Sequence, residues 1–216
     1  MTRLLITGFG PFPGVPRNPT DGLARSLAAD RRWRRLGVAA TALVLPTAYC
    51  AIEGALLPAL RDRAPHAVLM LGVAKRRRAV CLETRALNRV TRRLPDASGR
   101  LPASLAYRVG APFVRRPQAS IPVLAAAMRT AAPGCTRASR DAGRYLCNAA
   151  YFDALAERGP AAIVFVHVPL PHPGPGRTVR PGCQPRLTIA ETRRAVMAAA
   201  LSLARASRRR CPEPGR

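Results

Sequence analysis

Three side chains in this sequence have the types and settings that a thiol-dependent hydrolase needs. Cys147 follows a turn at Gly143 and opens a predicted helix, whose N-terminal backbone N–H groups favour a thiolate and can hold a developing oxyanion. His167 ends the most apolar segment of the chain, and Glu83 lies within a strand pattern. An imidazole can act as general base and acid, and a carboxylate can orient it. The three residues therefore predict a catalytic triad that requires neither a metal nor a cofactor.

Each of these residues also has a purely structural interpretation. None of the six cysteines forms a C-x-x-C pair, and an unreactive buried thiol is the commoner fate of a residue such as Cys147. His167 would then be a core histidine bonded to a backbone carbonyl. Glu83 would be a solvated edge-strand residue paired with Arg78 or Arg85. Sequence spacing alone does not bring the three together.

The elements that must position these residues alternate between strand and helix. Strands are predicted at 3–7, 38–45, 67–71, 78–88 and 161–168, with a short one before Gly143. Helices are predicted from a cap at Asn18 or Thr20 to about 32, and at 48–61, 120–131, 147–157 and 189–204. This alternation predicts a single-domain three-layer α/β/α fold with a twisted, mainly parallel, mixed sheet. His167 ends its strand at the edge of such a sheet, where ligands bind.

Local details refine these expectations. Cys81 and Glu83 should share one face of their strand, because strand side chains repeat every two residues. Pro58 should kink the last turn of the helix at 48–61, whereas Pro122 fits a first turn.

The organisation of the chain indicates one domain. Its 216 residues are 48% hydrophobic, enough for a sizeable core, and no repeat or linker is evident. We expect residues 1–206 to form the catalytic domain and 207–216 a basic, flexible tail. The proline-rich stretches 89–119 and 169–186 are predicted loops, long enough for lids, although disorder explains them as well.

The formal net charge of +25 invites a nucleic-acid hypothesis. However, Lys75 is the only lysine among 36 basic residues, and the arginines are spread along the whole chain, a pattern that indicates codon bias. The runs at 31–35, 75–78 and 208–210 are interpreted as solvated surface. Nucleic-acid binding is therefore expected to be absent or incidental and salt-sensitive. A basic binding protein with a vestigial triad remains the alternative from another class.

No stretch approaches the roughly 20 apolar residues that span a bilayer, so no membrane association is expected. The apolar run at residues 4–6 is too short for a signal peptide, which favours a cytoplasmic protein without a disulfide framework. The oligomeric state is open and includes a homo-oligomer.

Several segments resemble the pyroglutamyl-peptidase I family, in the family's order and across almost the whole chain. They are Leu4–Gly14 with Asn18-Pro19, Leu45–Thr47, Leu82–Asn88, Pro95-Asp96 with Gly99, Ala142–Asn148 and Phe165–Pro169. No single motif is specific, but the combination is. The resemblance implies an enzyme that removes pyroglutamate from small peptides with a blocked N-terminus. It also implies that Cys147 attacks the pyroglutamyl carbonyl, that His167 moves the proton, that Glu83 orients His167, and that water releases the acyl group.

The resemblance further implies how the substrate binds. Phe12 and Tyr145 match the aromatic positions that sandwich the lactam ring, and Phe9 would lie nearby. Val73 stands where the family has a glutamine expected to recognise the lactam, and a site that loses such a partner can lose discrimination. A related thiol amidase for another small cyclic or acylated amine is therefore an alternative. The basic run at 75–78 also suggests an acidic substrate.

Overall fold

A six-stranded sheet forms the centre of the computed structural model, which describes residues 1–157, 162–171 and 187–210. Its strand order is β2-β1-β3-β8-β4-β7. The strands are β1 (Thr2–Phe9), β2 (Val38–Leu45), β3 (Ala67–Val73), β4 (Val80–Glu83), β7 (Thr136–Ser139) and β8 (Ala162–Val168). Neighbouring strands pair in parallel except for β4 and β8, which are antiparallel. The predicted mainly parallel, mixed sheet is confirmed.

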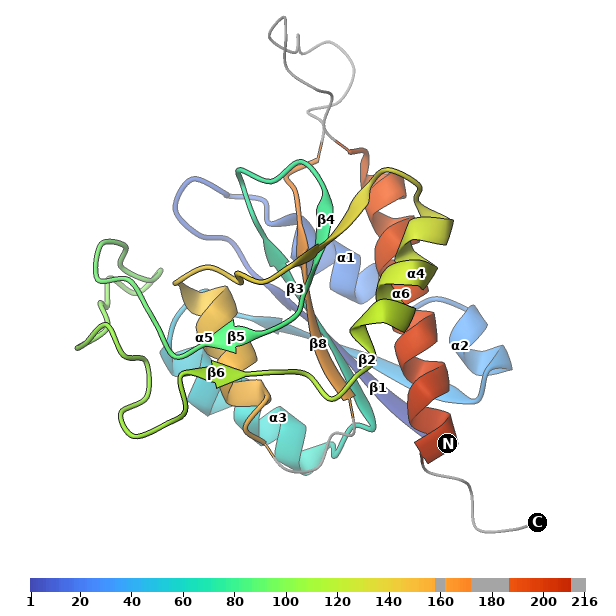
Figure 1. Ribbon diagram of the computed structural model, residues 1–216, viewed down its shortest axis with the longest axis horizontal. Helices are drawn as coiled ribbons and strands as arrows, with labels where there is room; N and C mark the ends of the chain where they lie inside the picture. The colour runs from blue at the N-terminus through green and yellow to red at the C-terminus, as the bar shows by residue number, and fades with distance from the viewer. Residues whose placement is uncertain (158–161, 172–186, 211–216) are drawn as a thin grey trace, which may run out of the picture.

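Helices cover both faces of this sheet (Figure 1). They are α1 (Pro19–Ala28), α2 (Arg32–Arg35), the π-helical turn η1 (Ile52–Leu56), α3 (Leu57–Asp62), α4 (Ile121–Ala131), α5 (Leu146–Ala154) and α6 (Ile189–Arg210). On β1, Leu4 and Ile6 belong to the core under α1, α4 and α6, whereas Leu5 belongs to the core under α3 and α5. Because alternate strand residues enter opposite cores, the three-layer architecture is confirmed. Among the described residues, no helix has both the length and the apolarity to cross a membrane.

The turn from β1 into α1 is tied down by two polar side chains. Asn18 caps α1 by accepting a hydrogen bond from the Thr20 backbone N–H (3.1 Å), and its amide donates to the Gly10 carbonyl (2.9 Å). The Thr20 hydroxyl accepts the backbone N–H of Phe9 (3.0 Å). These bonds satisfy groups that a helix start leaves open, and they fix the loop that follows β1.

The first helix ends earlier than predicted. It stops at Ala28 rather than at about residue 32, and the separate helix α2 follows. Asp30 explains the break, because its carboxylate accepts the Arg32 backbone N–H (3.1 Å) and its carbonyl accepts the Trp33 N–H (3.2 Å). Side chains of this type compete with helical bonding and start new helices.

The helix predicted at 48–61 contains a π-helical turn, η1, followed by α3. Pro58 lies in the first turn of α3 instead of kinking a last turn. Proline lacks an N–H and its ring crowds the carbonyl four residues earlier, so regular α-helical bonding cannot run through it. The wider η1 turn accommodates this interruption. Pro122 lies in the first turn of α4, as predicted.

The single strand predicted at 78–88 is wrong. After β4 the chain leaves the main sheet, and Ala86–Leu87 (β5) pairs antiparallel with Val114–Arg115 (β6) in a separate two-stranded sheet. The Asn148 side chain, from α5, accepts the Leu87 N–H (2.9 Å) and donates to the Leu87 carbonyl (2.7 Å). This tertiary contact takes the place of sheet pairing on that side.

The last helix is longer than predicted. It continues past residue 204 to Arg210, with the Ser207 side chain buried and bonded to the Leu203 carbonyl (3.1 Å). Residues 207–210 therefore belong to α6 rather than to the expected tail. Residues 211–216 and most of the predicted loop at 169–186 lie outside the described residues, whereas 89–119 is irregular apart from β6.

The contact between β1 and α1 leaves no room for a side chain at Gly8, where a Cβ would lie 2.3 Å from the Thr20 carbonyl oxygen. We expect Gly8→Ala to lower the free energy of unfolding by about 1–3 kcal/mol, because backbone would have to move. Gly22→Ala, at an exposed position of α1 with open space around it, is the control and should gain about 0.5–1 kcal/mol. Urea unfolding measures both. Equal stability of Gly8→Ala and the wild type would contradict the packing described.

Candidate active site

A pocket of about 410 Å³ opens beside the carboxyl ends of β3 and β8. Among its lining residues are Phe9, Phe12, Val73, Tyr145, Cys147 and His167. The structure thus brings the predicted nucleophile, base and substrate-contacting residues to one cavity, at the sheet edge where ligands were expected. Glu83, the remaining predicted site residue, does not line the pocket; it lies behind His167 in the protein interior.

Cys147 occupies the first turn of α5, after Tyr145 in extended conformation. Its thiol sits against strand β3 at Gly72, where a Cβ would come within 2.7 Å of both Cys147 Sγ and Phe165 Cζ. Since real Cβ atoms do not approach other atoms so closely, the absence of a side chain at Gly72 creates the space that the thiol uses.

The segment leading into α5 is ordered by Asp141. Its carboxylate accepts the Gly143 backbone N–H (3.0 Å), and its own N–H donates to the Ser139 hydroxyl (3.2 Å). Gly143 has a φ of 84°, a left-handed conformation that glycine adopts without strain. Residues 140–145, here the nucleophile loop, therefore deliver the chain to the start of α5 through a turn that requires this glycine.

The surroundings of Cys147 favour the neutral thiol over the thiolate that the helix N-terminus predicts. Burial raises the pKa of the Cys147 thiol to about 12, and the negative charge of Glu83 acts in the same direction. The backbone amide of Cys147 and the Arg77 charge lower this pKa but do not offset the loss of hydration. The backbone amide acts in the expected direction, but the expectation left out the loss of hydration at the sulfur. The thiol consequently needs a base.

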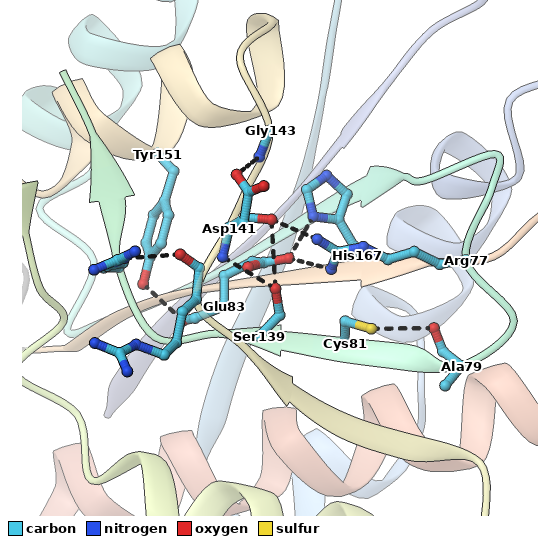
Figure 2. A network of polar contacts seen from close by, with 11 residues as sticks. Arg77, Ala79, Cys81, Glu83, Ser139, Asp141, Gly143, Tyr151 and His167 are labelled. Atoms are coloured by element: carbon cyan, nitrogen blue, oxygen red, sulfur yellow. Dashed lines mark hydrogen bonds and ion pairs between the residues drawn. The ribbon is translucent and has the colours of Figure 1, made fainter. Parts of the chain in front are cut away.

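His167 is the candidate base, because it lines the same pocket as Cys147. Figure 2 shows its imidazole beside the Glu83 carboxylate. Its Nδ1 lies 2.8 Å from Glu83 Oε1. An ionised carboxylate can only accept hydrogen bonds, so Nδ1 carries the proton and Nε2 keeps a free lone pair. The antiparallel pairing of β4 with β8 produces this contact, because it sets Cys81 opposite His167 and places Glu83 two residues further along the same face. Cys81 and Glu83 share a face, as predicted.

Glu83 is fully buried, so its interpretation as a solvated edge residue is wrong. Its cationic partner is Arg77, whose Nη1 donates to Glu83 Oε1 (2.5 Å), rather than Arg78 or Arg85. Arg85 instead donates to the Arg140 carbonyl (2.7 Å).

The Glu83 carboxylate is held in its ionised form. Burial acts to raise its pKa, but the hydrogen bond and charge of His167 and the charge of Arg77 act in the opposite direction, and the pKa is lowered. Sequence reasoning missed Arg77. A buried carboxylate needs a partner. A search of the loop before β4 for such a partner is the signal that could have pointed to Arg77.

Aromatic walls flank the pocket and are tied to neighbouring loops. The Lys75 ammonium lies 4.8 Å from the centre of the Phe12 ring and donates to the Pro13 carbonyl (3.1 Å). The Tyr145 hydroxyl donates to the Pro95 carbonyl (2.8 Å), which brings the segment 89–119 to the pocket. Lys75 is exposed, as predicted, and is also part of the pocket wall, whereas the interpretation of 75–78 as solvated surface is wrong for Arg77, which is half-buried.

The pocket offers few uncharged hydrogen-bonding side chains. Val73 is the last residue of β3 and lines the pocket half-buried. Asn18 and Thr47 also line it, but both donate to the Gly10 carbonyl (2.9 and 3.1 Å). Within the described part of the chain, no group of three or more His, Cys, Asp or Glu side chains could hold a metal ion.

The buried Glu83 charge should also support the fold. We expect Glu83→Gln to lower the free energy of unfolding at pH 7 by about 3 kcal/mol, because Arg77 would lose its partner. Since the folded state lowers the pKa of Glu83, its contribution is present above the usual glutamate range and shrinks as the pH falls through the folded-state pKa. Urea unfolding from pH 3 to 7 measures the difference. The control is Glu53→Gln, an exposed partner of Arg108, for which we expect a change below about 1 kcal/mol. A pH-independent difference for Glu83→Gln would contradict this assignment.

Comparison with known proteins places the chain in a family. A family model described as pyroglutamyl peptidase matches residues 2–206. A pyrrolidone-carboxylate peptidase of Gloeobacter violaceus is 37% identical over 171 residues, 77% of this chain and 81% of the relative. One of Streptomyces coelicolor is 35% identical over 148 residues, 68% of this chain and 67% of the relative. The solved pyrrolidone carboxyl peptidase from Thermococcus litoralis superimposes with a TM-score of 0.81 at 25% identity, covering 100% of this chain and 99% of the other. The sequence resemblance is confirmed, and the chain belongs to the pyroglutamyl peptidase family.

Proposed function

We propose that this protein is a cysteine exopeptidase that hydrolyses the amide bond after an N-terminal pyroglutamyl residue. The observation that supports it most directly is the buried Glu83–His167 pair beside a pocket that Cys147 also lines. Family membership supports the reaction class. We further propose that the chain acts as one catalytic domain that includes α6 to Arg210 rather than ending at residue 206. The cytoplasmic location, a homo-oligomer and incidental nucleic-acid binding stay predictions.

Acylation would proceed by general-base catalysis. His167 Nε2 takes the proton of the Cys147 thiol while Sγ forms a bond to the pyroglutamyl carbonyl carbon. Glu83 keeps Nδ1 protonated and stabilises the imidazolium that results. The backbone N–H groups at the start of α5 are the candidates to hold the oxyanion. His167 then returns the proton to the leaving amine as the C–N bond breaks, which leaves a thioester on Cys147.

Deacylation would use the same groups in reverse roles. His167 Nε2 removes a proton from water as the water oxygen bonds to the thioester carbonyl carbon. The C–S bond then breaks, and the proton passes from His167 to the Cys147 sulfur. The products are free pyroglutamate and the original thiol, so the cycle needs no cofactor.

The acyl ring would bind between aromatic side chains. Phe12 and Tyr145 contribute to the pocket lining with their rings anchored by Lys75 and Pro95, and Phe9 lies buried at the end of β1. A flat, neutral lactam suits such surfaces, because stacking recovers apolar contact without a buried charge.

The proposal is tested with a pyroglutamyl-linked fluorogenic amide. We expect the wild type to release the fluorophore and Cys147→Ala to reduce kcat by at least about 1,000-fold, because the nucleophile is gone. Cys50→Ala, at an exposed cysteine outside the pocket lining, is the control and should retain wild-type turnover. Turnover by Cys147→Ala would refute the nucleophile assignment, and an inactive wild type would refute the substrate.

Val73 favours a second candidate function, a related thiol amidase with relaxed recognition of the ring. We expect the wild type to discriminate weakly between pyroglutamyl and cyclopentylcarbonyl amides of one fluorophore. Val73→Gln should raise the ratio of their kcat/KM values about tenfold, the effect of one added hydrogen bond.

Steady-state kinetics on both amides measures this, with Val73→Leu as the apolar control. A wild type that strongly prefers the pyroglutamyl amide, with no gain in Val73→Gln, would set the second candidate aside.

A further inference from the structure

Arg77 joins two parts of the proposed active site that are far apart in the sequence. It lies between β3 and β4, and its guanidinium is bonded in two directions (Figure 2). One nitrogen, Nη1, donates to Glu83 Oε1, and the other, Nη2, donates to the backbone carbonyl of Asp141. Glu83 orients the proposed base, whereas Asp141 organises the nucleophile loop. One planar side chain therefore connects the base to the segment that carries the nucleophile.

The bond to Glu83 has an electrostatic consequence for His167. Both His167 Nδ1 and Arg77 Nη1 contact the same carboxylate oxygen, Oε1. A permanent positive charge at that oxygen offsets part of the negative charge that would otherwise stabilise the imidazolium. The same positive charge acts to lower the pKa of the Cys147 thiol, against burial and Glu83. Arg77 thus favours release of the protons from both reacting groups.

Several other charged or titratable groups surround this arrangement. They are Glu83 and Cys81 in β4, Arg137 in β7, His167 in β8, Cys147 and Tyr151 in α5, Asp141 in the nucleophile loop, and Lys75, Arg76 and Arg78 in the loop that carries Arg77. Of these groups, Glu83 is the carboxylate to which Arg77 donates. Arg76, Arg78 and Arg137 form no salt bridge with Glu83 in the described part of the chain. The effect of Arg77 should therefore exceed that of its neighbouring arginines.

We propose that Arg77 is a positioning residue that links Glu83 to the nucleophile loop and sets the pH range in which His167 and Cys147 exchange a proton. This inference rests on the proposed function, because it assigns His167 as the base. It adds a role for the loop between β3 and β4 that carries Arg77. The Arg77 side chain itself takes no part in bond making or breaking.

The test is an NMR titration of the imidazole groups in the full-length protein. The chain has only three histidines, so the His167 resonances can be assigned by their absence in His167→Asn. We expect Arg77→Gln to move the His167 titration midpoint upward by at least about half a pH unit, since a nearby cation is lost. Arg77→Lys retains the charge and should shift the midpoint by less than half as much. Arg76→Gln, at an exposed arginine of the same pocket, is the matched control and should also shift it by less than half as much.

Kinetics separates positioning from charge. Arg77→Lys replaces the rigid two-nitrogen fork by a single ammonium on a flexible chain, so we expect its kcat to fall at least fivefold with little change in KM, while its midpoint stays near that of the wild type. An unmoved midpoint in folded Arg77→Gln, or an equal shift in Arg76→Gln, overturns the proposal. If Arg77→Gln lacks the wild-type circular dichroism spectrum, the test rests on Arg77→Lys. A wild-type kcat in Arg77→Lys overturns the proposed link between Glu83 and the nucleophile loop, and the expected fall in kcat supports it.

The titration needs no turnover. It therefore reports on Arg77 even if the wild type fails to cleave a pyroglutamyl amide, and the two failures remain distinguishable.

Discussion

The buried carboxylate of Glu83 is the group around which the rest of the site is arranged. An ionised side chain taken out of water costs several kcal/mol unless donors replace its hydration. Here a single oxygen receives both the imidazole N–H of His167 and the guanidinium of Arg77. The reversal of β4 within an otherwise parallel sheet supplies the geometry, because antiparallel pairing with β8 brings Glu83 and His167 onto one face. The sheet topology thus supplies one of the partners that the buried carboxylate requires, and the proposed chemistry uses the same contact.

Much of the fold follows from local patterns in the chain. Strand β2 has the predicted bounds, and the continuous apolar runs of β3 and β8 are what strands buried on both faces require. The residues of the proposed triad could be selected because their types and settings are unusual for a surface, such as His167 at the end of an apolar strand and Cys147 after a glycine turn. The aromatic residues of the pocket were selected through the family resemblance. These features are short-range, so a sequence displays them directly.

The features that sequence reasoning missed depend on contacts between distant segments. The break between β4 and β5 comes from Asn148, which bonds Leu87 from another element. Arg77 could not be told from the adjacent arginines until the loop between β3 and β4 was folded over Glu83. The raised thiol pKa of Cys147 likewise reflects the loss of hydration that the folded protein imposes on the half-buried thiol, a property that no local motif encodes.

Gly72 has a consequence for how such an enzyme can diverge. The missing side chain lets the sulfur of Cys147 and the ring of Phe165 approach the backbone of β3. A methyl group there would displace the nucleophile, whereas the next residue of the strand, Val73, faces the ligand cavity and can vary without moving the sulfur. In the proposed enzyme, selectivity and reactivity would therefore depend on adjacent positions with opposite tolerance to mutation. An evolving lineage could change the acyl group at one position while the other keeps the proposed reaction intact.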